Sequence, residues 1–237
     1  QLLNEFRGIT LSLMSRILLP LLPFYIGLSL CALAYQGYFI KYVPLLLLSL
    51  LILIPAYALW VVVFYYIAGA YAGEKPWGIL KNHIPVCKKA LKTHSSTATE
   101  KYAQEAAAKR SQLKPEFTKE TISLFTQINH CGSVFAEVFF AMIISRILYG
   151  SVPAPGTMVI FCILLATCSI GAPGLPWGTV MVSLGTLTGI LKFGDSGIAL
   201  MFAVFALHDS FATACNMTCN GAIALLLTGY AKKHGLN

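Results

Sequence analysis

A polar stripe crosses an otherwise apolar stretch at residues 208–222, HDSFATACNMTCNGA. Asp209, Thr213, Asn216 and Asn220 follow one another at helical spacing, so they share one face of an α-helix. A carboxylate, a hydroxyl and two amides offer charge and hydrogen bonds to a polar ligand. Because a carboxylate that faces lipid is costly, this stripe should face a polar interior.

The composition places this stripe inside a membrane protein. Of 237 residues, 57% are hydrophobic and 11% are charged, against about 25% charged in a typical soluble domain. Ten Lys and Arg residues lie between Glu74 and Glu120, four lie near the ends, and three lie elsewhere. If the termini and the 74–120 region are cytoplasmic, the positive-inside rule is satisfied. The net charge of +8 therefore follows topology and predicts no nucleic-acid partner.

Seven cysteines are scattered along the chain without CxxC or zinc-type spacing. The odd number and the apolar surroundings argue against a disulfide framework. Cys215 and Cys219 could share a helix face, but small buried thiols are the preferred interpretation. No cofactor is predicted apart from a possible Na⁺. The chain begins at QLLNEFRG without a methionine or a cleavable signal peptide, so it could be a fragment.

Four apolar segments are long enough to cross a bilayer, namely 17–35, 42–73, 121–145 and 196–231. A further uncharged stretch, 147–191, is interrupted by VPAPG and by GAPGLPWG. Its 157–170 arm would be about 21 Å long as a helix, whereas a bilayer core is about 30 Å thick. A Pro/Gly break at this depth is tolerated only inside protein or along a cavity. We interpret 157–191 as a re-entrant hairpin; two short helices with a kink are the alternative.

These motifs resemble, in their order, the dicarboxylate/amino acid:cation symporters, which include the sodium-coupled glutamate-transporter homologues. QINHCGS at 127–133 lies where the family has its Asn-Met-Asp-Gly-Thr signature. DSFATACNMTCN at 209–220 resembles the substrate-binding stripe of the last helix. THSSTAT at 93–99, otherwise a capped loop turn, fits the tip of the first hairpin, and SIGAPGLP at 169–176 resembles the tip of the second.

The resemblance implies an all-α polytopic membrane protein, with an elevator-type transporter core and two re-entrant helical hairpins. Residues 1–40 would form a scaffold-type membrane helix and residues 41–237 the transport domain. That domain would contain a helix at 42–73, hairpin one at 76–112, a discontinuous helix at 119–150, hairpin two at 155–191 and the last helix at 195–232. The family's first helices, which hold much of the trimer scaffold, have no counterpart here.

The resemblance also implies roles for the polar stripe. Asp209 matches the carboxylate that pairs with the substrate's amino group, and Asn216 matches the amide that donates to its α-carboxylate. Thr213 matches a hydroxyl close to the substrate. The hairpin tips supply the remaining predicted positions, which are Ser95, Ser96 and Thr97 in the first and Gly174 and Pro176 in the second, a gate in the family.

Ala212 occupies the position where family members with acidic substrates place an arginine. Without that arginine, one carboxylate of aspartate or glutamate would be desolvated and unpaired, at a cost of about 3–5 kcal/mol. Such a cost corresponds to roughly two to three orders of magnitude in affinity. The substitution therefore favours a neutral substrate.

Two departures weaken the implied sodium sites. Cys131 and Asn220 each replace an aspartate of the family, and a thiol is a poor ligand for a hard cation. Glu137 lies where proton-coupled members carry a glutamate, and a carboxyl group inside the membrane can carry a proton; a structural glutamate is the alternative. The remaining predicted sodium positions are Asn129, Ser133, Ser169, Ile170, Ala172 and Asn220.

The sequence thus predicts a symporter of small neutral amino acids, coupled to H⁺ or Na⁺, in a multi-pass cell-membrane protein that contacts lipid. A homotrimer is expected if a full-length chain exists. The alternatives are a dicarboxylate:cation symporter and a degenerate, non-transporting protein of the same fold. An enzyme is not predicted, because no catalytic triad or metal spacing is present.

Overall fold

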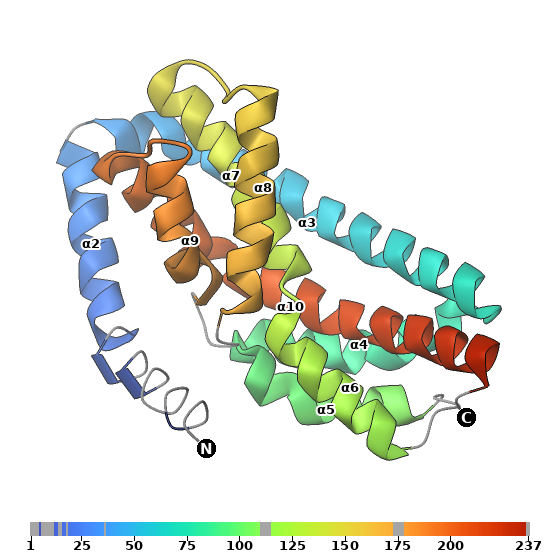
Figure 1. Ribbon diagram of the computed structural model, residues 1–237. Helices are drawn as coiled ribbons and strands as arrows, with labels where there is room; N and C mark the ends of the chain where they lie inside the picture. The colour runs from blue at the N-terminus through green and yellow to red at the C-terminus, as the bar shows by residue number, and fades with distance from the viewer. Residues whose placement is uncertain are drawn as a thin grey trace.

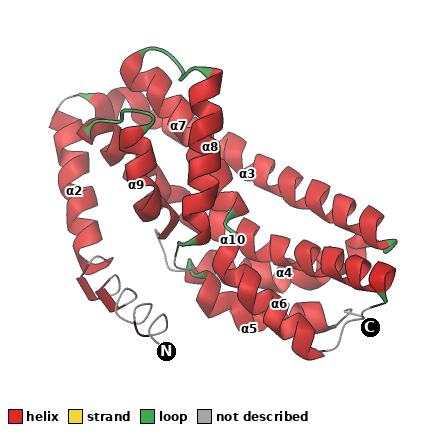
Figure 2. Cartoon of the chain, in the orientation of Figure 1, coloured by secondary structure: helices red, strands yellow, loops and turns green. Residues whose placement is uncertain are grey.

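The computed structural model describes residues 5, 12–13, 16–17, 19–35, 37–109, 115–172 and 178–235. Within this part of the chain the regular structure is helical and no strand occurs (Figure 2). The helices are α2 (Leu19–Tyr35), α3 (Tyr38–Ala72), α4 (Pro76–Thr93), α5 (Ser96–Ala108), α6 (Pro115–Ile128), α7 (Cys131–Tyr149), α8 (Pro155–Ile170), α9 (Gly178–Gly189) and α10 (Asp195–His234). The predicted all-α fold class is confirmed.

Three segments of the described chain are long and apolar enough to cross a membrane: Tyr42–Ala72, Phe117–Tyr149 and Asp195–His234. The second of these is broken between α6 and α7 at residues 129–130. With α8 as a further, shorter apolar helix, these segments make the chain a membrane protein, as its composition predicts.

Helix α10 runs through the middle of the molecule and packs against α3, α4 and α7 (Figure 1). In its most apolar window, 72% of the residues are buried inside the protein. Small residues allow this packing to be close. A Cβ at Gly229 would lie 2.6 Å from the Cα of Ala72, and one at Gly221 would lie 2.2 Å from the Tyr65 hydroxyl. The Tyr65 hydroxyl donates to the Thr218 carbonyl at 2.9 Å, which fixes α3 against α10.

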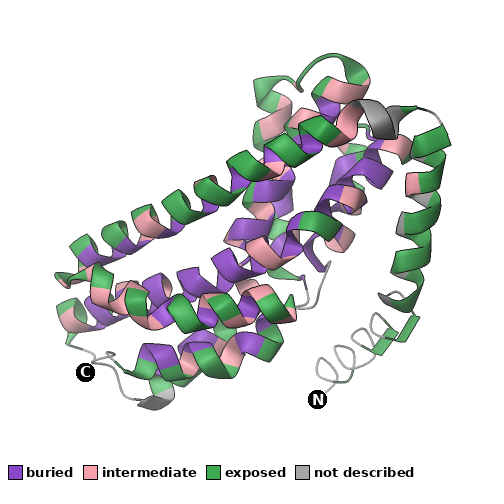
Figure 3. Cartoon of the chain, turned by 180° about the vertical axis from the view of Figure 1, so that it is seen from behind, coloured by how far each residue is buried: buried purple, intermediate pink, exposed green. Residues whose placement is uncertain are grey.

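Helix α3 has 35 residues, about 52 Å at 1.5 Å per residue, so it exceeds a bilayer core of about 30 Å. Gly73 ends it in the left-handed conformation, φ 68°, and its N–H donates to the Gly69 carbonyl, as expected of a glycine-terminated helix. At the same end, Lys232 of α10 forms an ion pair of 2.7 Å with Glu74. Seen from behind, most of the outer side of α3 is exposed (Figure 3).

Two pairs of shorter helices complete the fold. Helices α4 and α5 pack against each other, and so do α8 and α9. At 16 and 12 residues, α8 and α9 are about 24 Å and 18 Å long, both shorter than a bilayer core. These lengths are compatible with the predicted half-membrane arms.

A small cluster of buried residues joins the first helix pair to α10. Alanines dominate it, so the helices approach closely. Its members are Val86 and Ala90 of α4, Ala103, Ala106 and Ala107 of α5, Ile122 of α6, and Ala214, Met217 and Ala224 of α10. The pair of helices α4 and α5 is thereby packed against α10, the helix that carries the polar stripe.

Candidate functional site

The start of α7 is attached to the polar stripe through Asn216. The Gly132 N–H donates to Asn216 Oδ1 at 2.7 Å, and Asn216 Nδ2 donates to Ser133 Oγ at 3.0 Å. Gly132 permits this contact, because a Cβ there would lie 2.7 Å from the Ala212 carbonyl oxygen. The N-terminal N–H groups of α7 have no partner in their own helix, and Asn216 satisfies one of them.

A second amide, Asn129, bridges the α6–α7 break and α10. Its Nδ2 donates to the Asn216 carbonyl at 3.0 Å and to Asn220 Oδ1 at 2.8 Å. Its Oδ1 accepts from the Cys131 N–H at 3.3 Å, which fixes the orientation of the amide. Asn220 Nδ2 in turn lies 3.4 Å from Thr126 Oγ1. Two oxygens that could otherwise bind a cation thus accept hydrogen bonds from a neutral amide.

The rest of the stripe is enclosed. Asp209 is 7% exposed, Thr213 is 5% exposed and Ala212 is fully buried. Tyr57 of α3 lies within electrostatic range of Asp209. A buried polar face on α10 agrees with the expectation that a carboxylate here avoids lipid.

The turn between α4 and α5 contains the three predicted positions of the first hairpin tip. Ser95 caps α5, since its Oγ accepts from the Ala98 N–H at 3.3 Å. Ser96 is buried and Thr97 is exposed at the first turn of α5. A serine cap of this kind is a usual start of a helix, so the local structure follows from the sequence.

The second hairpin is described up to Ala172. Ser169 Oγ donates to the Leu165 carbonyl at 2.7 Å, and the Ser169 carbonyl accepts from the Ala172 N–H at 3.1 Å. The Ala172 backbone lies close to the His130 side chain, so the end of α8 is near the α6–α7 break. Ile170 is 59% exposed. Gly174 and Pro176 lie outside the described residues.

Glu137 is fully buried in α7. Ser183 of α9 lies beside its carboxyl group. The two histidines near the motifs are hydrogen-bonded to main-chain carbonyls, His130 to Gln127 at 3.0 Å and His208 to Val204 at 2.7 Å. Both histidines are thus packed in the protein and hydrogen-bonded within their own chain segment.

Sequence reasoning missed one feature of the site. Cys131 lies against Cys215 and Cys219, with all three Sγ atoms within 4.8 Å of one another. The four-residue spacing of the last two was the only signal in the sequence. The third thiol comes from another helix, and no local pattern reveals that contact.

Comparison with known proteins agrees with this arrangement. The sequence model of the sodium:dicarboxylate symporter family matches residues 1–230. No curated protein matches the chain. Since the family match spans nearly the whole chain, the resemblance drawn from the motifs is confirmed. The chain belongs to the sodium:dicarboxylate symporter family, whose members are cation-coupled transporters of small substrates and not enzymes.

Proposed function

We propose that this protein is a secondary symporter of small neutral amino acids. The observation that carries the proposal is the absence of a buried basic side chain: where the structure describes the side chains of Lys and Arg residues, none is buried. Ala212 stands, fully buried, between Asp209 and Asn216. A second substrate carboxylate would find no cation there, whereas an amino group would find Asp209.

The amide network is a reason to expect that sodium binds only weakly at this place. Asn129 donates to oxygens of Asn216 and Asn220, so a Na⁺ ion at this place would have to displace a hydrogen-bonded amide. Asn220 supplies no negative charge in compensation. Coupling to H⁺ through the buried Glu137 is therefore part of the proposal, with Na⁺ as the less important ion.

The transport cycle follows from the family resemblance. The second hairpin closes over the substrate, and the domain formed by residues 41–237 then moves across the membrane against a scaffold that includes residues 1–40. Multi-pass insertion in the cell membrane is part of this proposal, and so is a homotrimer if a full-length chain exists.

Ala212→Arg tests the choice of substrate. A guanidinium group would pair with a side-chain carboxylate through two parallel hydrogen bonds. We expect weaker binding of serine and alanine and new binding of aspartate, measured by competition in the full-length protein. Ala212→Met is the control, because it adds comparable bulk without charge. Thermal unfolding of both variants shows whether they are folded.

If the unaltered protein already prefers aspartate, the proposal of a neutral substrate is wrong. Its alternative, a dicarboxylate:cation symporter, is favoured by the description of the matching family. If Ala212→Arg changes neither the affinity for serine nor the affinity for aspartate, Ala212 does not determine specificity.

Glu137→Gln tests the coupling ion. Uptake into proteoliposomes is measured with pH and Na⁺ gradients imposed separately. We expect the unaltered protein to respond more to the pH gradient, and Glu137→Gln to lose that response, because an amide cannot carry the proton. A strictly Na⁺-driven uptake with an unchanged pH profile in the variant would contradict proton coupling.

A further inference from the structure

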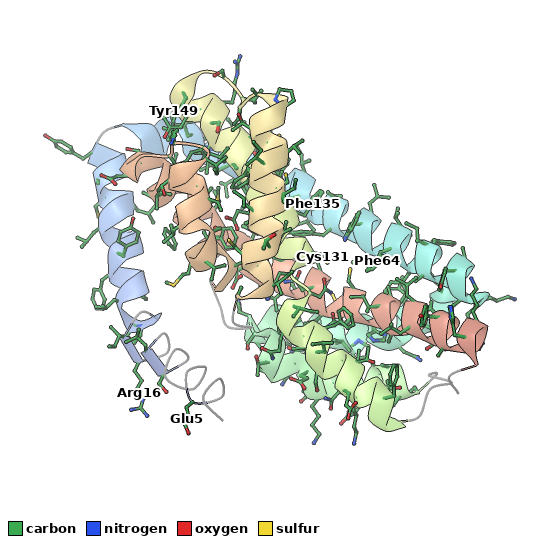
Figure 4. The ribbon with its side chains drawn as sticks, in the orientation of Figure 1. Glu5, Arg16, Phe64, Cys131, Phe135 and Tyr149 are labelled. Atoms are coloured by element: carbon green, nitrogen blue, oxygen red, sulfur yellow. The ribbon has the colours of Figure 1, made fainter. Side chains whose placement is uncertain are left out.

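Three thiols meet where α7 begins against α10. The Sγ atoms of Cys131, Cys215 and Cys219 all lie within 4.8 Å of one another. Cys215 and Cys219 are buried, whereas Cys131 is partly exposed. Figure 4 labels Cys131 at the start of α7. The two thiols of α10 are thus enclosed, whereas Cys131 is only partly covered.

The spacing of the sulfur atoms suits a single metal ion. A Zn–S bond is about 2.3 Å long, so three sulfurs around one such ion lie about 4 Å apart. The three Sγ atoms, which are at most 4.8 Å apart, would have to move closer by less than about 1 Å. Side-chain rotation about Cα–Cβ bonds covers such a distance without movement of the helices.

Helix packing, and not chance proximity on a surface, holds the thiols together. A Cβ at Gly132, the residue after Cys131, would lie 2.7 Å from the Cβ of Cys215. The hydrogen bond between the Gly132 N–H and Asn216 fixes the same contact. The ligand residues therefore lie in place before any metal arrives.

Two side chains of α3 complete the surroundings. The indole of Trp60 lies close to the Cys131 thiol. The Tyr57 hydroxyl is buried, has no hydrogen-bond partner among the described residues, and lies within electrostatic range of Cys131 and Cys215. Hydrogen-bond donors around sulfur ligands are typical of metal sites. A buried hydroxyl without a partner is costly. A negatively charged thiolate at the cluster could accept a hydrogen bond from the Tyr57 hydroxyl.

We propose that Cys131, Cys215 and Cys219 bind a soft, thiophilic metal ion, for which Cu(I) is the best match. Thiolates select soft ions such as Cu(I) or Zn(II), whereas Na⁺, Ca²⁺ and Mg²⁺ prefer oxygen. Each thiol that becomes a ligand releases its proton to water, and neither the metal nor the sulfur changes oxidation state. The site goes beyond amino acid transport and does not depend on which substrate is carried.

The test uses reduced full-length protein in lipid nanodiscs, titrated with Cu(I) under anaerobic conditions against a coloured Cu(I) chelator. The first variant changes only the four other cysteines, Cys31, Cys87, Cys162 and Cys168, to serine. We expect it to bind one Cu(I) per chain with the affinity of the unaltered protein. Zn(II) is titrated separately and should bind more weakly.

The second variant adds Cys215→Ser to the first. Loss of one partner outside the ligand shell typically weakens a metal site by about 10–100-fold, so loss of a ligand should weaken Cu(I) binding by at least about 100-fold. Cys131→Ala, in the same background, provides an independent variant at a partly exposed position. Thermal unfolding without metal shows that each variant is folded.

Three results would overturn the proposal. One is unchanged Cu(I) affinity in folded Cys215→Ser and Cys131→Ala. Another is loss of Cu(I) binding when only the four other cysteines are changed. The third is a Cys131–Cys215 disulfide in anaerobically purified protein, detected by alkylation before reduction, because those sulfurs would then not be available as thiolates.

Discussion

The two long helices α3 and α10 pack along each other but are built differently. In the most apolar window of each helix, 22% of the α3 residues are buried, against 72% in α10 (Figure 3). Residues 42–72 of α3 carry no charge, whereas α10 carries the carboxylate of Asp209 and the amides of Asn216 and Asn220. The difference shows that, of the two long helices, the one that other helices enclose carries the polar stripe. In α3, polar side chains such as Tyr57 and Tyr65 are buried toward that helix.

The largest effect is expected from crowding the enclosed helix. Gly221→Ala would place a Cβ 2.2 Å from the Tyr65 hydroxyl and 2.5 Å from His83 Nε2. Overpacking of this kind costs up to about 3 kcal/mol of unfolding free energy. Denaturant unfolding in detergent measures the loss. Gly185→Ala of α9 is the matched control, since a Cβ there meets nothing within 4 Å; equal losses in both variants would contradict close packing at Gly221.

Asn216→Ala comes next, with an expected loss of about 2 kcal/mol in unfolding free energy. The substitution leaves the Gly132 N–H and Ser133 Oγ without their partner, and buried unsatisfied groups cost about 1–3 kcal/mol each. Substrate binding should also disappear. If a folded Asn216→Ala variant keeps both its stability and its substrate affinity, Asn216 neither stabilises the α7–α10 contact nor belongs to the proposed substrate site.

Tyr65→Phe should have a smaller effect, about 1 kcal/mol. It removes only the hydroxyl that donates to the Thr218 carbonyl and keeps the ring in place. Because the contact lies on the α10 side of α3, a measurable loss would show that α3 contributes to the core there. Tyr66→Phe is the control at the neighbouring, 60% exposed position, and we expect no measurable change from it.

Leu51→Ala should have the smallest effect, below about 0.5 kcal/mol. Leu51 is 67% exposed, and lipid tails are as apolar as a leucine, so its removal leaves no cavity inside the protein. Leu53→Ala, two residues away and fully buried, should cost several times more. If both substitutions have the same effect on unfolding, the lipid-facing side of α3 is not where the burial pattern places it.

The sequence was most informative where a pattern is local. The helical spacing of Asp209, Thr213 and Asn216 predicts one face, and α10 is a continuous helix whose corresponding residues are buried. Likewise, Ser95 after a basic, amphipathic segment predicts a turn with a cap, and it caps α5. Such features depend on neighbours a few residues away, so propensity and periodicity reveal them.

Contacts between distant segments were not predictable in this way. No pattern in the sequence near Gly132 predicts that this glycine contacts Ala212 and Cys215, which lie 80 or more residues later. The same holds for Tyr65 and Thr218, 153 positions apart, and for the meeting of Cys131 with Cys219. The family resemblance supplied the order of the elements but not these contacts, because cysteines and small residues take several roles in a membrane core.

The burial of α10 also has a consequence for biogenesis. A segment that carries a carboxylate and two asparagine amides enters lipid less readily than one built of Leu, Ile and Val. During synthesis α10 emerges after α3, α4 and α7, the helices that will enclose it. The stable insertion of α10 in the bilayer thus depends on helices that are already present. A substitution that misplaces α7 should therefore expose α10 to quality-control proteases, while α3 remains inserted.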